Sequence, residues 1–259
     1  MTGEVLAPLL VRYGYWLGLD DDEVLADREE AAEDIRALQL ILRMERDRPP
    51  SWHTALALAA SASAAICLDP RAEPGGEWYD AVREYCAGHI RKVTRRARGA
   101  QWVATADLPG LTLSAGDTEI RALVPGRVQD LDKRISKLQV GGTDVAADEL
   151  ITPPPADALQ IWLPPSPIMT LGKAMAQTGH AGMIAAALLT ADQPRLHRWL
   201  RAGLLCSVRR ADVATWSSLS RTIADDGSAW AEEHLLAVRD AGFTEVAPGT
   251  VTAIAKVGW

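Results

Sequence analysis

The sequence is poor in cysteine and has no long apolar run. Its three cysteines, Cys67, Cys86 and Cys206, are scattered and form no CxxC pair. An odd number of thiols without paired spacing argues against a disulfide framework or a zinc site, and favours a reducing cytoplasm. No stretch of eighteen apolar residues occurs, so we expect no transmembrane helix. The N-terminus lacks a basic start followed by an apolar run, so we expect no signal peptide.

Several motifs that carry chemistry are also absent. The chain has no GxxxxGK[ST] phosphate loop, no HExxH pair and no EF-hand loop. We therefore expect no bound nucleotide, no metal and no other cofactor. No serine stands in a nucleophile elbow with histidine and aspartate partners, so a covalent acyl-enzyme is not expected.

Acidic charge is concentrated at the N-terminus. The net charge is −7, and residues 1–38 alone carry ten acidic and three basic side chains, which is the whole of that balance. The remaining body is neutral and contains one strong basic run, His89–Arg98. Its arginines Arg95, Arg96 and Arg98 are candidates for contacts with phosphates. The alternative is an edge strand whose basic positions face water.

Composition divides the chain into four parts. Residues 1–38 are predicted to be an acidic helical segment. Residues 139–158 include consecutive prolines, which cannot continue a helix or an inner strand, and are predicted to be a linker. The linker separates two blocks, 39–138 and 159–259.

One predicted helix carries three polar side chains on one stripe. The segment begins Gly172-Lys-Ala-Met-Ala-Gln-Thr-Gly-His180. At about 100° per residue, Gln177 lies about 40° round from Lys173, and His180 about 20° round on the other side. The other faces of this helix carry small side chains. The alternative is an amphipathic helix whose three polar residues face water.

The C-terminal segment combines a carboxylate with several hydroxyls near two predicted turns. Asp240-Ala-Gly and Pro248-Gly249 are turn sequences, and runs with strand character flank them at 234–238 and 250–255. Asp240, Thr244, Thr250 and Thr252 are therefore expected at or near strand ends, where sites on α/β sheets are usually built. The alternative is an ordinary turn aspartate with strand threonines.

Together these two segments resemble the signature segments of the type-two (archaeal and eukaryotic) peptidyl-tRNA hydrolase family, over roughly residues 158–259. The resemblance implies a catalytic set at the matching positions Lys173, Gln177, Asp240, Thr244 and Thr252. It also implies a tRNA partner. We expect further substrate contacts at His180, Thr250, Gly172 and Gly242, and at Arg95, Arg96 and Arg98.

The sequence departs from the family pattern at three places. Leu171 stands where the family usually has a second lysine, Phe243 where it usually has arginine, and Glu245 where it usually has glutamine. Two positive charges are lost and one negative charge is gained, so the binding of a polyanion is expected to be weaker or different.

The implied reaction is hydrolysis of the ester that joins a peptide or N-acyl-aminoacyl group to tRNA. Lys173 is the candidate for stabilising the tetrahedral oxyanion or protonating the leaving oxygen. Asp240 either orients water or holds Lys173 charged and aimed. Two alternatives stay open: a tRNA-dependent transferase that passes the acyl group to an amine, and a noncatalytic module that binds tRNA or a protein.

The two blocks resemble divergent copies of one another. Five segments recur in the same order: Leu38–Leu42 with Leu159–Leu163, Thr54–Ser61 with Lys173–His180, Ala87–Val93 with Ala202–Val208, Ala115–Ile120 with Ala241–Val246, and Val124–Gly126 with Ala247–Gly249. The first block has Thr54, Leu58 and Ser61 in place of the polar helix residues, and Ser114 in place of Asp240. This pattern predicts a noncatalytic copy, and an intrachain pseudo-dimer that can function as a monomer.

The order of predicted elements indicates an α/β fold. We expect a mixed four-stranded sheet with helices on both faces, repeated as two tandem pseudo-equivalent copies. In the second block we expect strands near 158–163 and 204–209, and helices near 171–189, 194–202 and 212–225, before two C-terminal strands.

Overall fold

The structure is a computed structural model that describes residues 2–16, 31–148, 153–240 and 245–259. Most of the acidic N-terminal run therefore lies outside the described residues. Within them, no helix combines the length and apolar character needed to cross a bilayer.

The first half of the chain forms a five-stranded mixed sheet. Its strands and helices are α1 (Ala7–Trp16), β1 (Arg36–Arg43), α3 (Trp52–Cys67), α4 (Tyr79–Ala87), β2 (Arg91–Ala97), α5 (Gly99–Val103), β3 (Gly110–Ala115), β4 (Thr118–Leu123), β5 (Gly126–Arg127) and α6 (Lys133–Ser136). The strand order is β2-β1-β4-β3, and β5 pairs with β1 beside β4. This sheet begins at Arg36, a few residues before the expected start of the first block.

The second half forms a four-stranded mixed sheet, as expected. Its elements are β6 (Leu159–Leu163), α7 (Leu171–Leu189), α8 (Gln193–Arg201), β7 (Cys206–Arg210), α9 (Val213–Thr222), α10 (Asp226–Glu233), β8 (Leu235–Arg239) and β9 (Val251–Lys256). The strand order is β7-β6-β9-β8. The sequence predicted the bounds of α7 but missed α10, whose N-cap Asp225 is the predicted end of the preceding helix.

The two sheets have the same topology. In each, the first strand pairs in parallel with the second and antiparallel with the fourth, and the third pairs antiparallel with the fourth. A long helix and a shorter one follow the first strand in both halves. This agreement is compatible with tandem copies of one fold.

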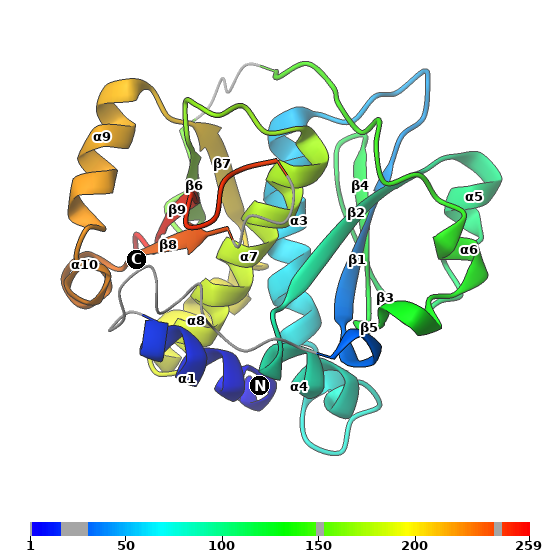
Figure 1. Ribbon diagram of the computed structural model, residues 1–259, viewed down its shortest axis with the longest axis horizontal. Coiled ribbons are helices and arrows are strands. Elements are labelled where there is room, and N and C mark those ends of the chain that lie inside the picture. The colour runs from blue at the N-terminus through cyan, green and yellow to red at the C-terminus, as the bar shows by residue number, and fades with distance from the viewer. Residues whose placement is uncertain (1, 17–30, 149–152, 241–244) are drawn as a thin grey trace.

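Helices cover both faces of each sheet (Figure 1). The long helices α3 and α7 lie side by side between the two sheets, where the largest hydrophobic core forms. Helices α5 and α6 cover the outer face of the first sheet, and Trp102 and Ile135 pack there against Ile41. Helices α9 and α10 cover the outer face of the second sheet through Trp216 and Ala229. The predicted α/β class with helices on both faces is confirmed.

Strand register corrects three of the proposed segment matches. Leu38 pairs with Lys92 and Leu159 pairs with Cys206, so Lys92 corresponds to Cys206 and the predicted match is wrong by one residue. Strand β4 corresponds to β9, so the match of Ala115–Ile120 with Ala241–Val246 is also wrong. Val124–Gly126 follows β4, whereas Ala247–Gly249 precedes β9, so these turns are not equivalent.

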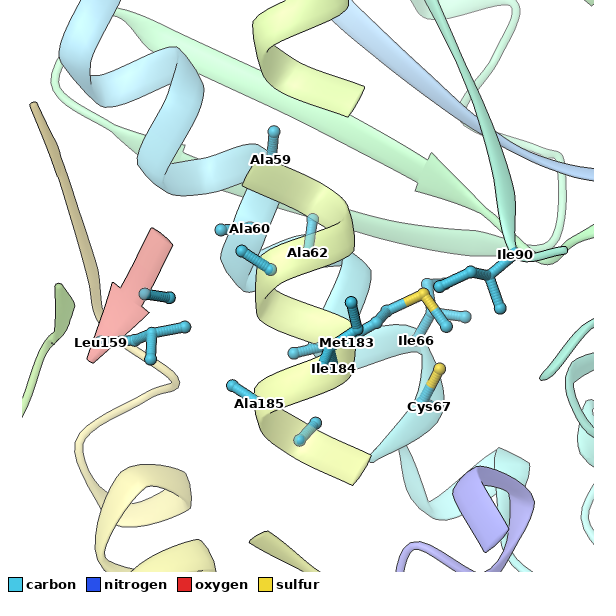
Figure 2. Close-up of a cluster of buried hydrophobic side chains, with 14 of the residues drawn as sticks. Ala59, Ala60, Ala62, Ile66, Cys67, Ile90, Leu159, Met183, Ile184 and Ala185 are labelled. Carbon is cyan, nitrogen blue, oxygen red and sulfur yellow. The ribbon is translucent and has the colours of Figure 1, made fainter. Parts of the chain in front are cut away.

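Small residues allow the central helices to pack at very short distance. Alanines fill much of the surface between α3 and α7, among them Ala59, Ala60 and Ala185 (Figure 2). The Cβ of an alanine at position 182 would lie 2.3 Å from the carbonyl oxygen of Ala60, and at position 179 it would lie 2.7 Å from Ser63 Oγ. At Gly182 the two helix backbones are therefore in contact, which only glycine permits, and at Gly179 the helix backbone lies against the side chains of Ser63 and Lys92.

The helix crossing is reciprocal. When α3 and α7 are aligned at their N-caps, Ser51 and Thr170, Gly182 corresponds to Ser63 and Gly179 to Ala60. Exchanging the two helices therefore converts the contact of Ala60 with Gly182 into the contact of Ser63 with Gly179. Such self-complementarity is typical of a two-fold interface between equivalent subunits.

The N-terminal segment packs across both halves and is not a separate unit. Val5, Leu6 and Leu9 are fully buried in the main core. Arg12 Nη1 donates to the carbonyl of Ala87 in the first half. The hydroxyl of Tyr13 donates to the carbonyl of Ala237 at 2.7 Å and accepts from the amide of the same residue at 3.2 Å. Because β8 is an edge strand, this side chain satisfies a backbone edge that would otherwise need water.

We expect Tyr13→Phe to lower the free energy of unfolding by about 2 kcal/mol, because it leaves a buried amide and carbonyl without their partner. Urea unfolding followed by tryptophan fluorescence measures this change. Tyr79→Phe is the matched control, since its hydroxyl bonds Glu4 in an exposed position. An equal effect of the two substitutions would contradict the role given to Tyr13.

The predicted linker is in close contact with both halves. Gln139 forms a β-bridge with Arg96. Asp148 accepts from Ser51 Oγ at 2.5 Å and from the amide of His53 at 3.1 Å, at the start of α3. Asp144 accepts from the amide of Leu171 at 2.8 Å, at the start of α7. The segment thus places one carboxylate at the N-terminus of each central helix, where the helix dipole favours negative charge.

Candidate active site

Helix α7 is buried almost all round. Of its 19 residues, every one except Lys173 and His180 is buried, and Gln177 is only 2% exposed. A helix in such surroundings does not present a polar stripe to water, so the alternative of an ordinary amphipathic helix is wrong. Its polar side chains must instead find partners within the protein.

A continuous chain of polar contacts joins α7 to two strands of the second sheet. The ammonium of Lys173 forms an ion pair with Asp240 Oδ2. Gln177 Nε2 donates to the same oxygen at 2.8 Å. The hydroxyl of Thr252 donates to Gln177 Oε1 and lies 3.2 Å from the carbonyl of Val238. Thr252 therefore fixes the orientation of the Gln177 amide, which in turn fixes the carboxylate.

The ion pair is shielded from solvent but not sealed. The side chains of Lys173 and Asp240 are 11% and 8% exposed. A charge pair in such surroundings interacts more strongly than one at the surface, and each charge depends on its partner to offset its desolvation. The second donor on Asp240, from Gln177, contributes to this compensation.

Asp240 is held by the turn that follows β8. Its amide donates to the carbonyl of Thr250 at 3.0 Å, and its carbonyl accepts from the amide of Gly249 at 2.8 Å. In the first sheet, Ala115 pairs with Thr118 across a two-residue turn. The first half therefore has no counterpart of the longer loop that begins at Asp240. The proposed match of Asp240 with Ser114 is wrong, because register places Ala115 level with Arg239, and Ser114 therefore precedes the position of Asp240.

The start of α7 is fixed by a carboxylate from the C-terminal segment. Thr170 caps the helix, because its hydroxyl oxygen accepts from the amide of Lys173. Glu245 in turn accepts from the amide of Thr170 at 2.9 Å and from its hydroxyl at 2.6 Å. Glu245 is one of the departures from the family pattern, and here it connects the loop after β8 to the helix that carries Lys173.

His180 lies at the boundary between the two halves. Its Nδ1 is 3.4 Å from the ammonium of Lys92 on β2. Burial, together with the charges of Lys92 and Lys173, holds the pKa of His180 well below its usual value, so the imidazole is neutral at neutral pH. Burial lowers the pKa of Lys92 from 10.5 to about 7. A contact of His180 with substrate stays a prediction.

The depressed pKa of Lys92 predicts a pH-dependent stability. The folded protein releases this proton near pH 7, whereas the unfolded chain keeps it to about pH 10.5, so stability rises with pH across that window. We expect Lys92→Met to stabilise the protein by about 2 kcal/mol at pH 7, after discounting the full conversion of about 1.4 kcal/mol per pKa unit for solvent screening.

The comparison of unfolding curves at pH 7 and pH 10 measures this effect. The advantage of the Lys92→Met variant should shrink strongly at the higher pH, because pH 10 lies near the pKa of 10.5 at which the unfolded chain also releases this proton. Lys133→Met removes an exposed lysine and is the control. A pH-independent difference would show that packing, rather than charge, is responsible.

The structure separates the three arginines of the basic run. Arg95 donates to Gln39 Oε1 at 2.8 Å and to the carbonyl of Leu138 at 2.9 Å, so it supports the first sheet. Arg96 bonds Gln139 Oε1 at the sheet edge, and Arg98 is exposed. The run does form an edge strand, as the alternative held, but Arg95 and Arg96 are engaged within the protein.

The other predicted residues have mixed outcomes. Thr250 Oγ1 donates to the carbonyl of Ala247 and so supports the turn. The carbonyl of Gly172 accepts from Thr94 Oγ1 at 2.9 Å, which joins α7 to the first sheet. Gly242 and Thr244 lie outside the described residues. Sequence reasoning missed Lys92, Asp144 and Thr170; only Thr170 carried a signal, as a capping residue three positions before Lys173.

Among the described residues, no group of three or more His, Cys, Asp or Glu side chains is placed to hold a metal ion. The polar chain combines one cation, one carboxylate, one amide and one hydroxyl. Such a set can stabilise a developing negative charge and orient a small nucleophile.

Comparison with known proteins bears on the same region. The family model described as peptidyl-tRNA hydrolase PTH2 matches residues 168–257. No curated protein and no solved structure matches the chain. The matched region holds Lys173, Gln177, Asp240 and Thr252, and excludes the whole of the first sheet. The C-terminal block of this chain is thus similar to the peptidyl-tRNA hydrolase PTH2 family over residues 168–257.

Proposed function

We propose that the protein hydrolyses the ester between tRNA and a peptide or N-acyl-aminoacyl group, and releases free tRNA. The observation that carries this proposal is the chain from Lys173 through Asp240 and Gln177 to Thr252, within the region that matches the family. It combines a cation with a carboxylate that is fixed from a second side.

In the proposed reaction, water attacks the ester carbonyl carbon and a tetrahedral oxyanion forms. The ammonium of Lys173 stabilises this charge, because a cation placed before the reaction needs no reorganisation. The bond from carbon to the ribose oxygen then breaks, and that oxygen takes up a proton. The free acid and the tRNA hydroxyl are the products.

Asp240 serves in this proposal to hold Lys173. Both Lys173 and Gln177 donate to Oδ2 of Asp240, so the carboxylate fixes the direction of the ammonium. The buried hydroxyl of Thr252 and amide of Gln177 keep the carboxylate from rotating. Thr244 keeps its predicted place in the catalytic set as part of this proposal.

We also propose that the two sheets are tandem copies that form an intrachain pseudo-dimer, of which only the second copy is catalytic. The shared topology and the reciprocal crossing of α3 and α7 support this. So does the absence of charge at the matching positions of the first copy, where Thr54 and Leu58 stand for Lys173 and Gln177. The proposed activity and the free cysteines fit a cytoplasmic protein.

The decisive experiment measures release of tRNA from an N-acetyl-aminoacyl-tRNA by the full chain. The acyl product is analysed with and without an added amine. Free acid in both conditions supports hydrolysis, whereas an amide that forms only with the amine would favour the transferase. No turnover together with tRNA binding would overturn the catalytic proposal in favour of a binding module.

A further inference from the structure

A small basic pocket lies on the first sheet, where β1 and β2 end. It has a volume of about 250 Å³, and its lining includes three cations and two amides: Arg96, Arg98, Lys137, Gln101 and Gln139. Arg98, Lys137 and Gln101 are exposed. The lining contains no carboxylate; the nearby Glu45 is bound by Arg43 and by the amide of Gly99. We call these five residues the basic pocket.

The basic pocket adjoins the helix that carries Lys173. Arg96 lies on the same face of β2 as Thr94, whose hydroxyl bonds the carbonyl of Gly172 at 2.9 Å. The guanidinium carbon of Arg96 lies 3.2 Å from the position that a Cβ on Gly142 would occupy. Thr143 Oγ1 lies 3.1 Å from the position that a Cβ on Gly172 would occupy. The segment between Gln139 and Asp144 therefore runs from the basic pocket directly to the start of α7.

The second copy does not repeat this pocket. By strand register, Arg96 corresponds to Arg210 and Arg98 to Asp212. Arg210 bonds the carbonyl of Pro164, and its guanidinium carbon lies 5.5 Å from the centroid of the Trp52 ring. Asp212 is an N-cap that accepts from Thr215. One copy thus keeps the polar catalytic set, and the other keeps the exposed cations.

The surroundings of Lys173 themselves are acidic. Asp144 and Glu245 lie at the N-terminus of α7, and Asp240 pairs with the lysine. A polyanionic substrate that enters there needs a positive potential close by to offset these carboxylates. Residues Leu171 and Phe243 supply none, so the cations have to come from elsewhere in the fold.

We infer that the basic pocket of the noncatalytic half binds backbone phosphates of the tRNA whose acylated end lies at Lys173. This inference rests on the proposed function and adds a substrate-binding role for the first half. Reciprocal packing of the two halves places β2 of the first half beside the catalytic helix of the second. Neither half alone would therefore bind both the tRNA phosphates and the acylated end. Arg98 and Lys137 supply exposed cations, and Arg96 is held at the pocket by Gln139.

The test compares the double variant Arg98→Gln/Lys137→Gln with Arg201→Gln/Arg221→Gln. The control removes two exposed arginines on α8 and α9 and changes the net charge equally. Binding of uncharged tRNA is measured by fluorescence anisotropy over a range of salt concentrations. Losing two phosphate contacts should weaken binding at least tenfold at low salt and reduce the salt slope by about 0.7 to 0.9 for each contact, while the control binds like the wild type.

A second substrate separates this inference from the proposed activity. An N-acetyl-aminoacyl ester of adenosine carries no phosphate, so the double variant should hydrolyse it at the wild-type rate while its KM for the full N-acetyl-aminoacyl-tRNA rises. Turnover by the wild type, together with equal tRNA affinity in the two double variants, would contradict the phosphate-binding role of the basic pocket and leave the proposed hydrolase activity standing. If the wild type shows no turnover but the two double variants still differ in tRNA affinity, the proposed hydrolase activity is contradicted and the phosphate-binding role of the basic pocket is supported.

Discussion

Replacing Lys173 with methionine is expected to lower kcat for N-acetyl-aminoacyl-tRNA by a factor of about 100 to 1000. This is the usual loss when one preorganised donor to an oxyanion is removed. The change also removes the ion pair that Lys173 makes with Asp240, whose side chain is 8% exposed. Some loss of stability should therefore accompany the loss of activity.

The measurement is single-turnover release of tRNA at saturating enzyme, together with the unfolding curve of each variant. Lys173→Arg keeps the charge and should retain more activity than Lys173→Met. Thr54→Ala is the matched control, since Thr54 has the same place after the N-cap of α3 that Lys173 has after the N-cap of α7. A folded Lys173→Met variant within about threefold of wild type would remove Lys173 from the proposed mechanism.

Replacing Gly182 with alanine is expected to destabilise the protein by about 3 kcal/mol. A Cβ at this position would lie 2.3 Å from the carbonyl oxygen of Ala60, and 2.9 Å from its carbonyl carbon. Overpacking of a core at this scale forces the backbone to move. Helix propensity alone predicts the opposite sign, since alanine is favoured over glycine in a helix by about 1 kcal/mol.

Two further variants sharpen this prediction. Gly141→Ala is the control, because a Cβ there meets nothing within 4 Å. Ala60→Gly combined with Gly182→Ala should not restore stability, since the clash is with backbone and not with the alanine methyl. Stabilisation by Gly182→Ala in urea unfolding would contradict the close contact of the two helix backbones, and with it the reciprocal interface.

The local elements of the second half could be predicted from sequence because their signals are local. Helix α7 is bounded by the capping Thr170 and by a loss of apolar residues after Leu189, and the prediction matched it. Gly203, with a φ of 73°, ends the segment after α8 as expected. The missed helix α10 is short, and its cap Asp225 is also the last residue of the helix predicted before it.

The polar composition of the site could also be predicted, since Lys173, Gln177 and Asp240 stand in two recognisable segments. Their mutual contacts could not. Gln177 is buried because its amide lies against Asp240 and Thr252 of the second sheet, which are 63 and 75 residues away in sequence. The partner of His180 is Lys92, 88 residues earlier, and no local pattern links the two.

Sequence by itself determined which residues of this protein carry charge and hydroxyl groups, and where the helices and strands of the second half lie, with the exception of α10. Caps, periodicity and turn residues act over a few positions, so their physics is present in the chain before it folds. Tertiary structure alone decided the strand register, which corrected the matches between the halves. It also decided how α7 meets the first half, because the approach of Gly182 to the Ala60 backbone and of Gly179 to the side chains of Ser63 and Lys92 depends on elements meeting in space.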